Sequence, residues 1–166
     1  MAIAQGRNGQ IKIVLPASSG VDPTALTGTY SAPGGNGTLL GNLRSWSLDE
    51  TVETVDATTM STSTGFIFRD VLPSFKSWTA TADVLFEDDP AGAAGSNNLD
   101  INDALFRSGE TVNVFIYPEG DAGANDRVYY GRALITSKAI SSSYDGLIEV
   151  SLTFEGRQTL YVSELA

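Results

Sequence analysis

The sequence predicts a mainly β fold, an antiparallel β-sandwich or open barrel with one flanking α-helix. Two observations predict it. Apolar and polar residues alternate with a period of two along several segments, which is the pattern of strands with one buried face. Turn-forming residues separate these segments, and the chain holds 17 glycines and 6 prolines. Its 166 residues, 42% of them hydrophobic, fit a single domain over residues 1–166.

The first half of the chain predicts one short strand and one long strand, separated by irregular segments. We expect the short strand at 10–15. The glycines and prolines of 16–38 predict a loop, or an arm that orders only against a neighbouring subunit. A long strand follows at 42–57. We expect residues 57–75 to form a long excursion between strands, because their pattern is too irregular for one element.

A second long strand, expected at 76–87, shares its pattern with the strand at 42–57. One side of each strand is apolar and includes a tryptophan, Trp46 in the first and Trp78 in the second. The opposite side is rich in serine, threonine, aspartate and glutamate. Val55 interrupts the alternation, which indicates a bulge or a twist. Each long strand therefore presents a core face and a hydrophilic face.

One helix is expected, at 98–108. Asn98 is a suitable N-cap and Gly109 a suitable C-terminal stop. Asp100, Asn102 and Asp103 resemble the start of a calcium loop, but the glycine at its sixth position and the glutamate at its twelfth are missing. A capped helix explains these residues better.

Three strands complete the predicted sheet. They are expected at 111–117, 127–142 and 146–156. Asp145 and Gly146 form a turn signal, so the last two strands are expected to make a hairpin.

The composition argues against an enzyme. The chain has no cysteine and no histidine, which excludes triads that need histidine and zinc sites built on either residue. Glu87, Asp88 and Asp89 form the densest acidic cluster and could serve glycoside hydrolysis, but a solvated strand end explains them more simply. We predict no catalytic residues, no metal and no cofactor.

The charge balance excludes another class of function. Ten basic residues stand against 20 acidic ones, for a formal net charge of −10. DNA-binding proteins need a basic face, because they displace counterions with lysine and arginine. The longest apolar stretches hold only a few residues, so we expect no membrane association. No basic segment precedes the first short apolar run, so we expect no secretory signal.

The order of the segments resembles that of the major tail tube proteins of long-tailed, siphovirus-like bacteriophages. The first long strand lies in NLRSWSLDETVETVDATTM, and the second is preceded and formed by FRDVLPSFKSWTATADVLFEDD. The same order continues through NNLDINDALFRSGE, YPEGD, VYYGRALITS and DGLIEVSLTFEG. The resemblance covers about residues 42–156, and the segment 16–38 has no counterpart in it.

The resemblance implies a structural virion protein. Members of that family form hexameric rings that stack into a hollow tube, and their inner sheets join into one continuous β-barrel through which DNA passes. The implied partners are further copies of the chain and other tail proteins (tape measure, tail terminator, distal tail). The implied location is the virion tail, assembled in the cytoplasm of the bacterial host. Double-stranded DNA would pass through without specific binding.

Two sets of residues are candidates for function in such a tube. The hydrophilic sides of the long strands are candidates for the channel wall, because a polar wall with carboxylates repels phosphate and leaves a hydrated surface along which DNA can slide. The apolar part of the excursion is a candidate for contacts between subunits, because it carries more apolar surface than a free loop should expose. The channel candidates are Asp49, Thr51, Glu53, Thr79, Thr81, Asp83, Glu149, Ser151 and Thr153; the contact candidates are Phe66, Ile67, Phe68, Val71, Leu72 and Phe75.

Other functions fit parts of the same sequence. A tail terminator or a capsid decoration protein would be another virion β-protein. A carbohydrate-binding module would use Trp46, Trp78, Tyr129 and Tyr130 as a stacking platform, but the tryptophans share their side of the strand with apolar residues, which favours the core. Tyr129 and Tyr130 are adjacent, so we expect one of them to point outward.

Overall fold

The protein is an antiparallel β structure in this computed structural model, which describes residues 9–14, 38–40, 43–57, 70–85, 107–120, 126–142 and 148–164. Within these ranges the strands pair in the order β2-β1-β5-β6-β7-β4-β3, and β8 pairs with β6. This confirms the prediction of a mainly β, antiparallel fold. The strands are β1 (Gln10–Val14), β2 (Thr38–Leu39), β3 (Leu43–Asp56), β4 (Val71–Leu85), β5 (Thr111–Tyr117), β6 (Arg127–Ser141), β7 (Glu149–Gly156) and β8 (Tyr161–Glu164).

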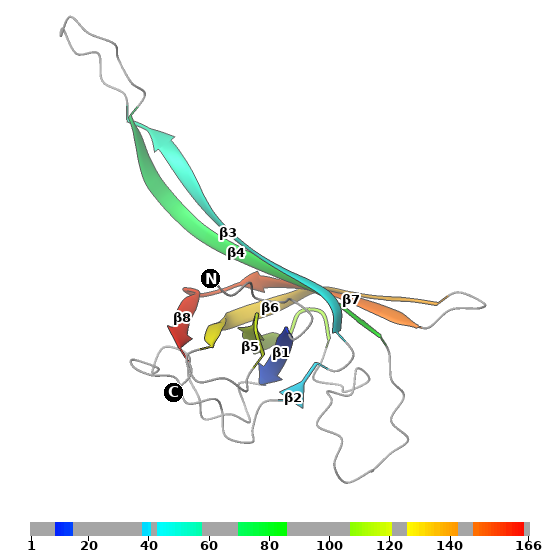
Figure 1. Ribbon diagram of the computed structural model, residues 1–166. Helices are drawn as coiled ribbons and strands as arrows, with labels where there is room; N and C mark the ends of the chain where they lie inside the picture. The colour runs from blue at the N-terminus through cyan, green and yellow to red at the C-terminus, as the bar shows by residue number, and fades with distance from the viewer. Residues whose placement is uncertain are drawn as a thin grey trace, which may run out of the picture.

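The long strand β6 belongs to two layers (Figure 1). Its first half pairs with β5 on one edge and with β8 on the other, whereas its second half pairs with β7. A register shift between Ile135 and Ser137, with one extra residue on β6, separates the two halves. Such a bulge bends a strand and increases its twist. In Figure 1 the layer of β1, β2 and β5 lies below the layer of β3, β4 and β7.

The main core fills the space between these layers. The even-numbered residues 78–84 of β4, 112–116 of β5 and 150–154 of β7 point inward and are almost fully buried, as the alternation predicted for β4, β5 and β7. Trp78 is 4% exposed, and its indole Nε1–H donates to the carbonyl of Gln158 at 2.7 Å. The tryptophan therefore belongs to the core, as expected from its position in the strand.

Trp78 packs closely against the backbone of β6 at Gly131 and of β7 at Gly156. A Cβ on Gly131 would lie 2.7 Å from Cζ2 of the indole. A Cβ on Gly156 would lie 2.5 Å from Cδ1 and closer still to two other ring atoms. Only glycine leaves room for the ring at these two positions.

A second, aromatic cluster lies on the other side of β5 and β6. Phe115, Tyr130 and Tyr161 are cross-strand neighbours, and their rings stack in a ladder. The ring centroids are 6.0 Å apart for the first pair and 5.4 Å for the second. Tyr130 is 2% exposed, and its neighbour Tyr129 packs partly buried against the main core. The expectation that one of the two adjacent tyrosines points outward is therefore wrong.

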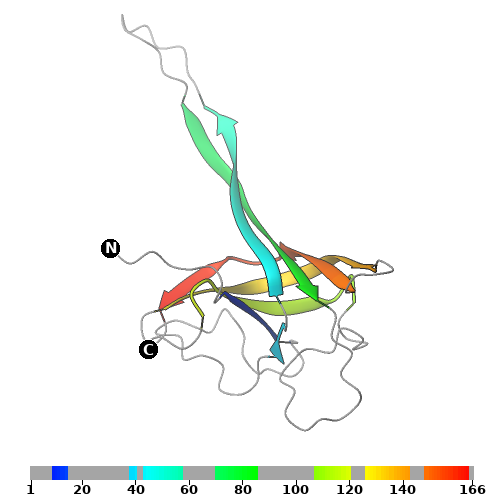
Figure 2. The same ribbon diagram turned by 45° about the vertical axis from the view of Figure 1, so that its right-hand side comes forward.

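The hairpin of β3 and β4 extends well beyond the body of the protein (Figures 1 and 2). β7 pairs with β4 only from Thr79 onward, so the earlier part of β4 pairs with β3 alone. We call the two-stranded part, residues 50–56 and 71–77, the arm. Every residue of the arm is exposed. A two-stranded ribbon is marginally stable in water when nothing covers either face.

The predicted start of the second long strand is wrong. The second long strand begins at Val71, five residues before the expected start at Lys76, so the last part of the expected excursion is strand. The arm buries neither face, and therefore its sequence lacks the alternation that marks a half-buried strand. Pro73 has no N–H to donate to a second neighbour, and it pairs with Thr54 where β4 has a partner on one edge only.

The other predictions of secondary structure are confirmed in part. The strands expected at 10–15, 42–57, 111–117, 127–142 and 146–156 are all present in the described residues, with small changes of boundary. β2 and β8 were not predicted. A register shift near Val55, between Val52 and Thr54, confirms the expected irregularity. The expected helix lies outside the described residues except for its end, where Arg107 begins a turn, and Gly109 has a positive φ of 95°.

Candidate functional site

The side of β3, β4, β7 and the second half of β6 that faces away from the core is hydrophilic. Residues that pair across antiparallel strands point to the same side, so the register identifies the members of this surface. Three rows cross it: Ser45–Asp83–Ser151, Ser47–Thr81–Thr153 and Asp49–Thr79–Glu155. We call this surface the polar face. Its members are Arg44, Ser45, Ser47, Asp49, Thr51, Ser77, Thr79, Thr81, Asp83, Leu85, Ser137, Ala139, Ser141, Glu149, Ser151, Thr153 and Glu155.

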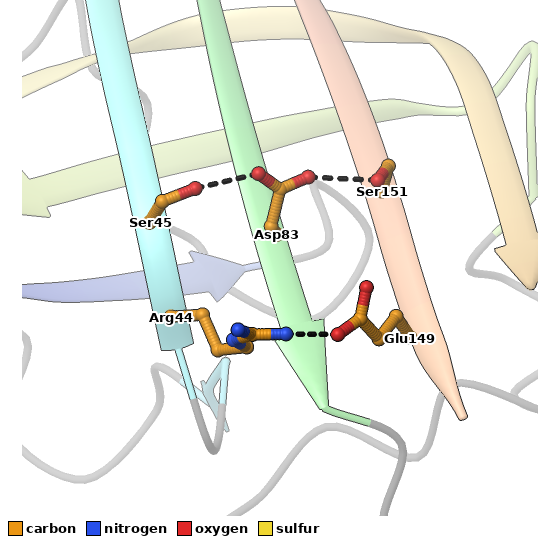
Figure 3. A network of polar contacts seen from close by, with 5 residues as sticks. All are labelled: Arg44, Ser45, Asp83, Glu149 and Ser151. Atoms are coloured by element: carbon orange, nitrogen blue, oxygen red, sulfur yellow. Dashed lines mark hydrogen bonds and ion pairs between the residues drawn. The ribbon is translucent and has the colours of Figure 1, made fainter. Parts of the chain in front are cut away.

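Asp83 is the centre of a hydrogen-bonded row on this face (Figure 3). Ser45 on β3 donates to one carboxylate oxygen at 2.5 Å, and Ser151 on β7 donates to the other at 2.7 Å. The hydrogen bonds from Ser45 and then from Ser151 lower the pKa of the Asp83 carboxyl; burial opposes them, and the charge of Arg44 lowers the pKa further. Asp83 is therefore a fixed negative charge held by both neighbouring strands.

Further hydroxyl pairs connect β3 to β4 along the same face. The hydroxyls of Ser47 and Thr81 lie 2.7 Å apart, and those of Thr51 and Ser77 lie 2.8 Å apart. In each pair one hydroxyl donates to the other. The polar groups of this face thus bind largely to one another across the strands.

Arg44 reaches the polar face through a bulge. Leu43 pairs with Val84 and Ser45 with Asp83, so β3 has one extra residue at this point, and that residue is Arg44. Its guanidinium forms an ion pair with Glu149 of β7, crossing over β4 (Figure 3). Both side chains are about half exposed, at 57% and 47%. Simple alternation would have placed Arg44 on the core side with Leu48.

The predicted channel residues all lie on β3, β4 and β7, and the structure brings eight of the nine together on the polar face. Glu53 is exposed in the arm, within the second irregularity, and has no register partner that would assign its side. Thr79 and Thr153 are half-buried, and the other six are exposed. The prediction missed Ser45, Ser47, Ser77 and Glu155, which share the parity of the predicted residues, and Arg44, which no parity argument would have found.

The predicted contact residues fall into two groups. Val71, Leu72 and Phe75 lie in the arm and are 43%, 56% and 74% exposed. Phe66, Ile67 and Phe68 lie outside the described residues, so the structure does not place them.

The structure adds little support for the other candidate sites. Glu87, Asp88, Asp89, Asp100 and Asp103 lie outside the described residues. Among the residues that are described, no group of three or more acidic side chains could hold a metal ion. Nor does that part of the chain contain a helix of the length and apolar character needed to cross a membrane. Both tryptophans pack against the core, so they form no open stacking platform.

Comparison with known proteins shows which solved structures share this fold. No protein-family model matches the sequence, and no curated protein matches it. Solved structures do match. The chain is similar to a chain in the tail of an empty gene transfer agent particle with C6 symmetry, with a TM-score of 0.64, 20% identity, and coverage of 96% of this chain and 98% of that one. It is also similar to the SPP1 tail tube, with a TM-score of 0.62, 15% identity, and coverage of 98% and 80%.

A third match comes from a different kind of particle. A chain of the anti-feeding prophage baseplate has a TM-score of 0.59 at 10% identity, over 98% of this chain and 96% of that one. All of these chains come from phage tails or tail-like particles. The fold is thus that of the subunits from which such tails are built. More particularly, the fold is shared with the chain of the SPP1 tail tube.

Proposed function

We propose that this chain is a major tail tube subunit, which forms rings that stack into a hollow tube conducting double-stranded DNA. One observation carries the proposal: a four-stranded sheet with a polar face ends in two strand edges. β3 pairs only with β4, and β6 has no strand on its β5 side beyond Ile135, as far as the described strands go. Unpaired edges favour pairing with another chain.

Pairing of these edges between copies gives a ring. The β3 edge of one copy meets the β6 edge of the next, and four strands from each copy then continue around a closed barrel. Six copies per ring is the symmetry we propose, since the tail of the matched gene transfer agent particle has C6 symmetry. Closure removes both exposed edges.

The polar face lines the bore in this arrangement. It carries four carboxylates, on Asp49, Asp83, Glu149 and Glu155, and one guanidinium, for a formal net charge of −3 per copy. Such a wall repels phosphate and holds water between itself and the DNA. The candidate channel residues are thus proposed to face the DNA without binding it.

The arm provides the contact between rings. Its valines, Leu72 and Phe75 are exposed although a two-stranded ribbon gains stability only when a face is covered. A copy in the next ring would cover them. The other proposed partners are the tape measure, tail terminator and distal tail proteins, and the proposed location is the virion tail, after assembly in the bacterial cytoplasm. The role is structural and not enzymatic.

Engineered cysteines test the edge pairing. The chain contains no cysteine, so Ser47→Cys on β3 and Ser137→Cys on β6 introduce the only two thiols. Within one copy these positions are three strands apart, about 14 Å at the usual strand spacing, which is too far for a disulfide. Under oxidation we expect covalent ladders of up to six copies. Because the register between copies is not fixed in advance, Ser45→Cys and Ala139→Cys extend the panel.

A matched pair provides the control. Thr81→Cys with Ser137→Cys places one thiol on an inner strand, where no neighbouring copy can reach it, and we expect no covalent link between copies on a denaturing gel. Negative-stain electron microscopy of the wild-type chain should show filaments with a central hole. Monomers at all concentrations, or cross-linking that is equal for both pairs, would refute the edge pairing.

A second set of variants tests the arm. Leu72→Ser with Phe75→Ser should leave rings intact but prevent stacking into tubes. Val162→Ser is the control, because Val162 is as exposed as Leu72, at 56%, and lies on β8 away from the arm. Normal tubes from the arm variant would count against this role.

A further inference from the structure

The single cation of the polar face has a position that simple repulsion of DNA does not explain. Arg44 is the only basic residue among the described members of this face, and a bulge brings it there. Guanidinium is the side-chain group best suited to phosphate, because its planar fork donates two parallel hydrogen bonds. An open ring of such groups around a DNA channel would retain the backbone that has to slide past.

Two carboxylates surround this guanidinium. Glu149 on β7 forms an ion pair with it, and Asp83 on β4 is near enough for the charge of Arg44 to lower the pKa of the Asp83 carboxyl. Asp83 is in turn held by the serines on both sides. A phosphate that approached Arg44 would have to displace Glu149 and would meet the charge of Asp83.

We propose that Glu149 masks Arg44 against DNA phosphate, so that the wall stays non-adhesive because its one cation is occupied and not merely because its net charge is negative. This inference rests on the proposed function, since it assigns the polar face to the DNA channel. The proposal gives Glu149 a role that the other three carboxylates of the face lack: only its removal releases a group that can bind phosphate.

The matched control is already present on the same strand. Glu149→Gln and Glu155→Gln each remove one carboxylate from the polar face and change the charge by the same amount, but only the first releases Arg44. Glu149→Ala provides a second form of the release. Arg44→Gln combined with Glu149→Gln removes the cation that would be released. Folding of every variant is checked by circular dichroism.

The assay measures binding of a fluorescein-labelled DNA duplex by anisotropy, with both the unassembled chain and assembled tubes, at rising NaCl. We expect Glu149→Gln and Glu149→Ala to bind DNA at low salt, and wild type, Glu155→Gln and the double variant to bind weakly or not at all. A slope of about −0.9 per phosphate contact means a loss of about threefold in affinity per released Arg44 in contact between about 50 and 200 mM salt.

The outcomes separate this inference from the proposed function. Equal binding by Glu149→Gln and Glu155→Gln would overturn the masking role, since charge alone would then explain the effect, even if tubes form normally. No binding by either Glu149 variant would overturn it as well. If only the Glu149 variants bind DNA but no variant forms tubes, the masking of Arg44 stands and the tube assignment fails.

Discussion

Gly156→Ala is expected to destabilise the protein through Trp78. The glycine has no positive φ that would exclude alanine, so the effect is one of space. The new Cβ would lie 2.5 Å from Cδ1 of the indole and nearer to two further ring atoms, so the ring has to move. Overpacking of this kind costs about 1–3 kcal/mol. Displacement also breaks the hydrogen bond from Nε1 to Gln158, worth about 1 kcal/mol.

The expected loss in the free energy of unfolding is therefore about 2–4 kcal/mol. Urea unfolding followed by tryptophan fluorescence and circular dichroism measures it. The control is the same substitution in a Trp78→Phe background, where the smaller ring leaves room for the Cβ. A double-mutant cycle should then show a coupling of about 1–3 kcal/mol between the two positions. Additive effects of Gly156→Ala and Trp78→Phe, or a loss below about 0.5 kcal/mol for Gly156→Ala, would refute the steric argument.

Three further outcomes are expected. Ser45→Ala should raise the pKa of Asp83, as followed by NMR, and an unchanged pKa would contradict the hydrogen bond. Because the pKa of Asp83 is depressed in the folded state, the stability that the variant loses is present at neutral pH and vanishes as the pH falls through that pKa. Tyr161→Ala should lower the raised pKa of Tyr130 and speed amide exchange in β8, with a loss of about 0.5–1.5 kcal/mol from stacking alone. Phe75→Ser should change the stability of the unassembled chain by less than about 0.5 kcal/mol in thermal melting, since the ring is 74% exposed; a larger loss would mean that it packs on its own core.

Alternation predicted the part of the fold in which one face of a strand is buried. Val150, Leu152 and Phe154 are buried and their neighbours on β7 are exposed or half-buried, as the sequence indicated. The same holds for Ala80 and Ala82 on β4. In these strands burial of one face requires a period of two, so the pattern determines both the strand and its orientation.

Burial on both faces or on neither removes that signal. β4 in the arm buries nothing, and its start at Val71 was missed. β8 has four residues, too few to show a period. It pairs with β6, where Tyr161 stacks on Tyr130, and this contact joins separate parts of the chain. Pairwise contacts of this kind cannot be read from either segment alone.

The bulge at Arg44 limits what parity can predict about the candidate site. Before the bulge, Leu43 points to the core side with Val84, and after it, Ser45 points to the polar side with Asp83. A single extra residue thus reverses the assignment of everything that precedes it. The nine predicted residues lie after the bulge or on other strands, which is why the error did not reach them and why Arg44 itself was missed.

Several hydrogen-bond donors of the polar face already have an acceptor there, which limits their binding of phosphate in a way that the net charge does not describe. Ser45 and Ser151 both donate to Asp83, the hydroxyls of Ser47 and Thr81 bind each other, and the guanidinium of Arg44 is paired. A phosphate oxygen needs donors, and each donor that already has an acceptor on the face must first give it up. In the proposed tube, a wall with the same net charge but unpaired hydroxyls and an open guanidinium would offer DNA many weak contacts in every ring. Removal of an acceptor should therefore increase adhesion more than an equal change of charge elsewhere on the face, and the comparison of Glu149 with Glu155 measures that difference.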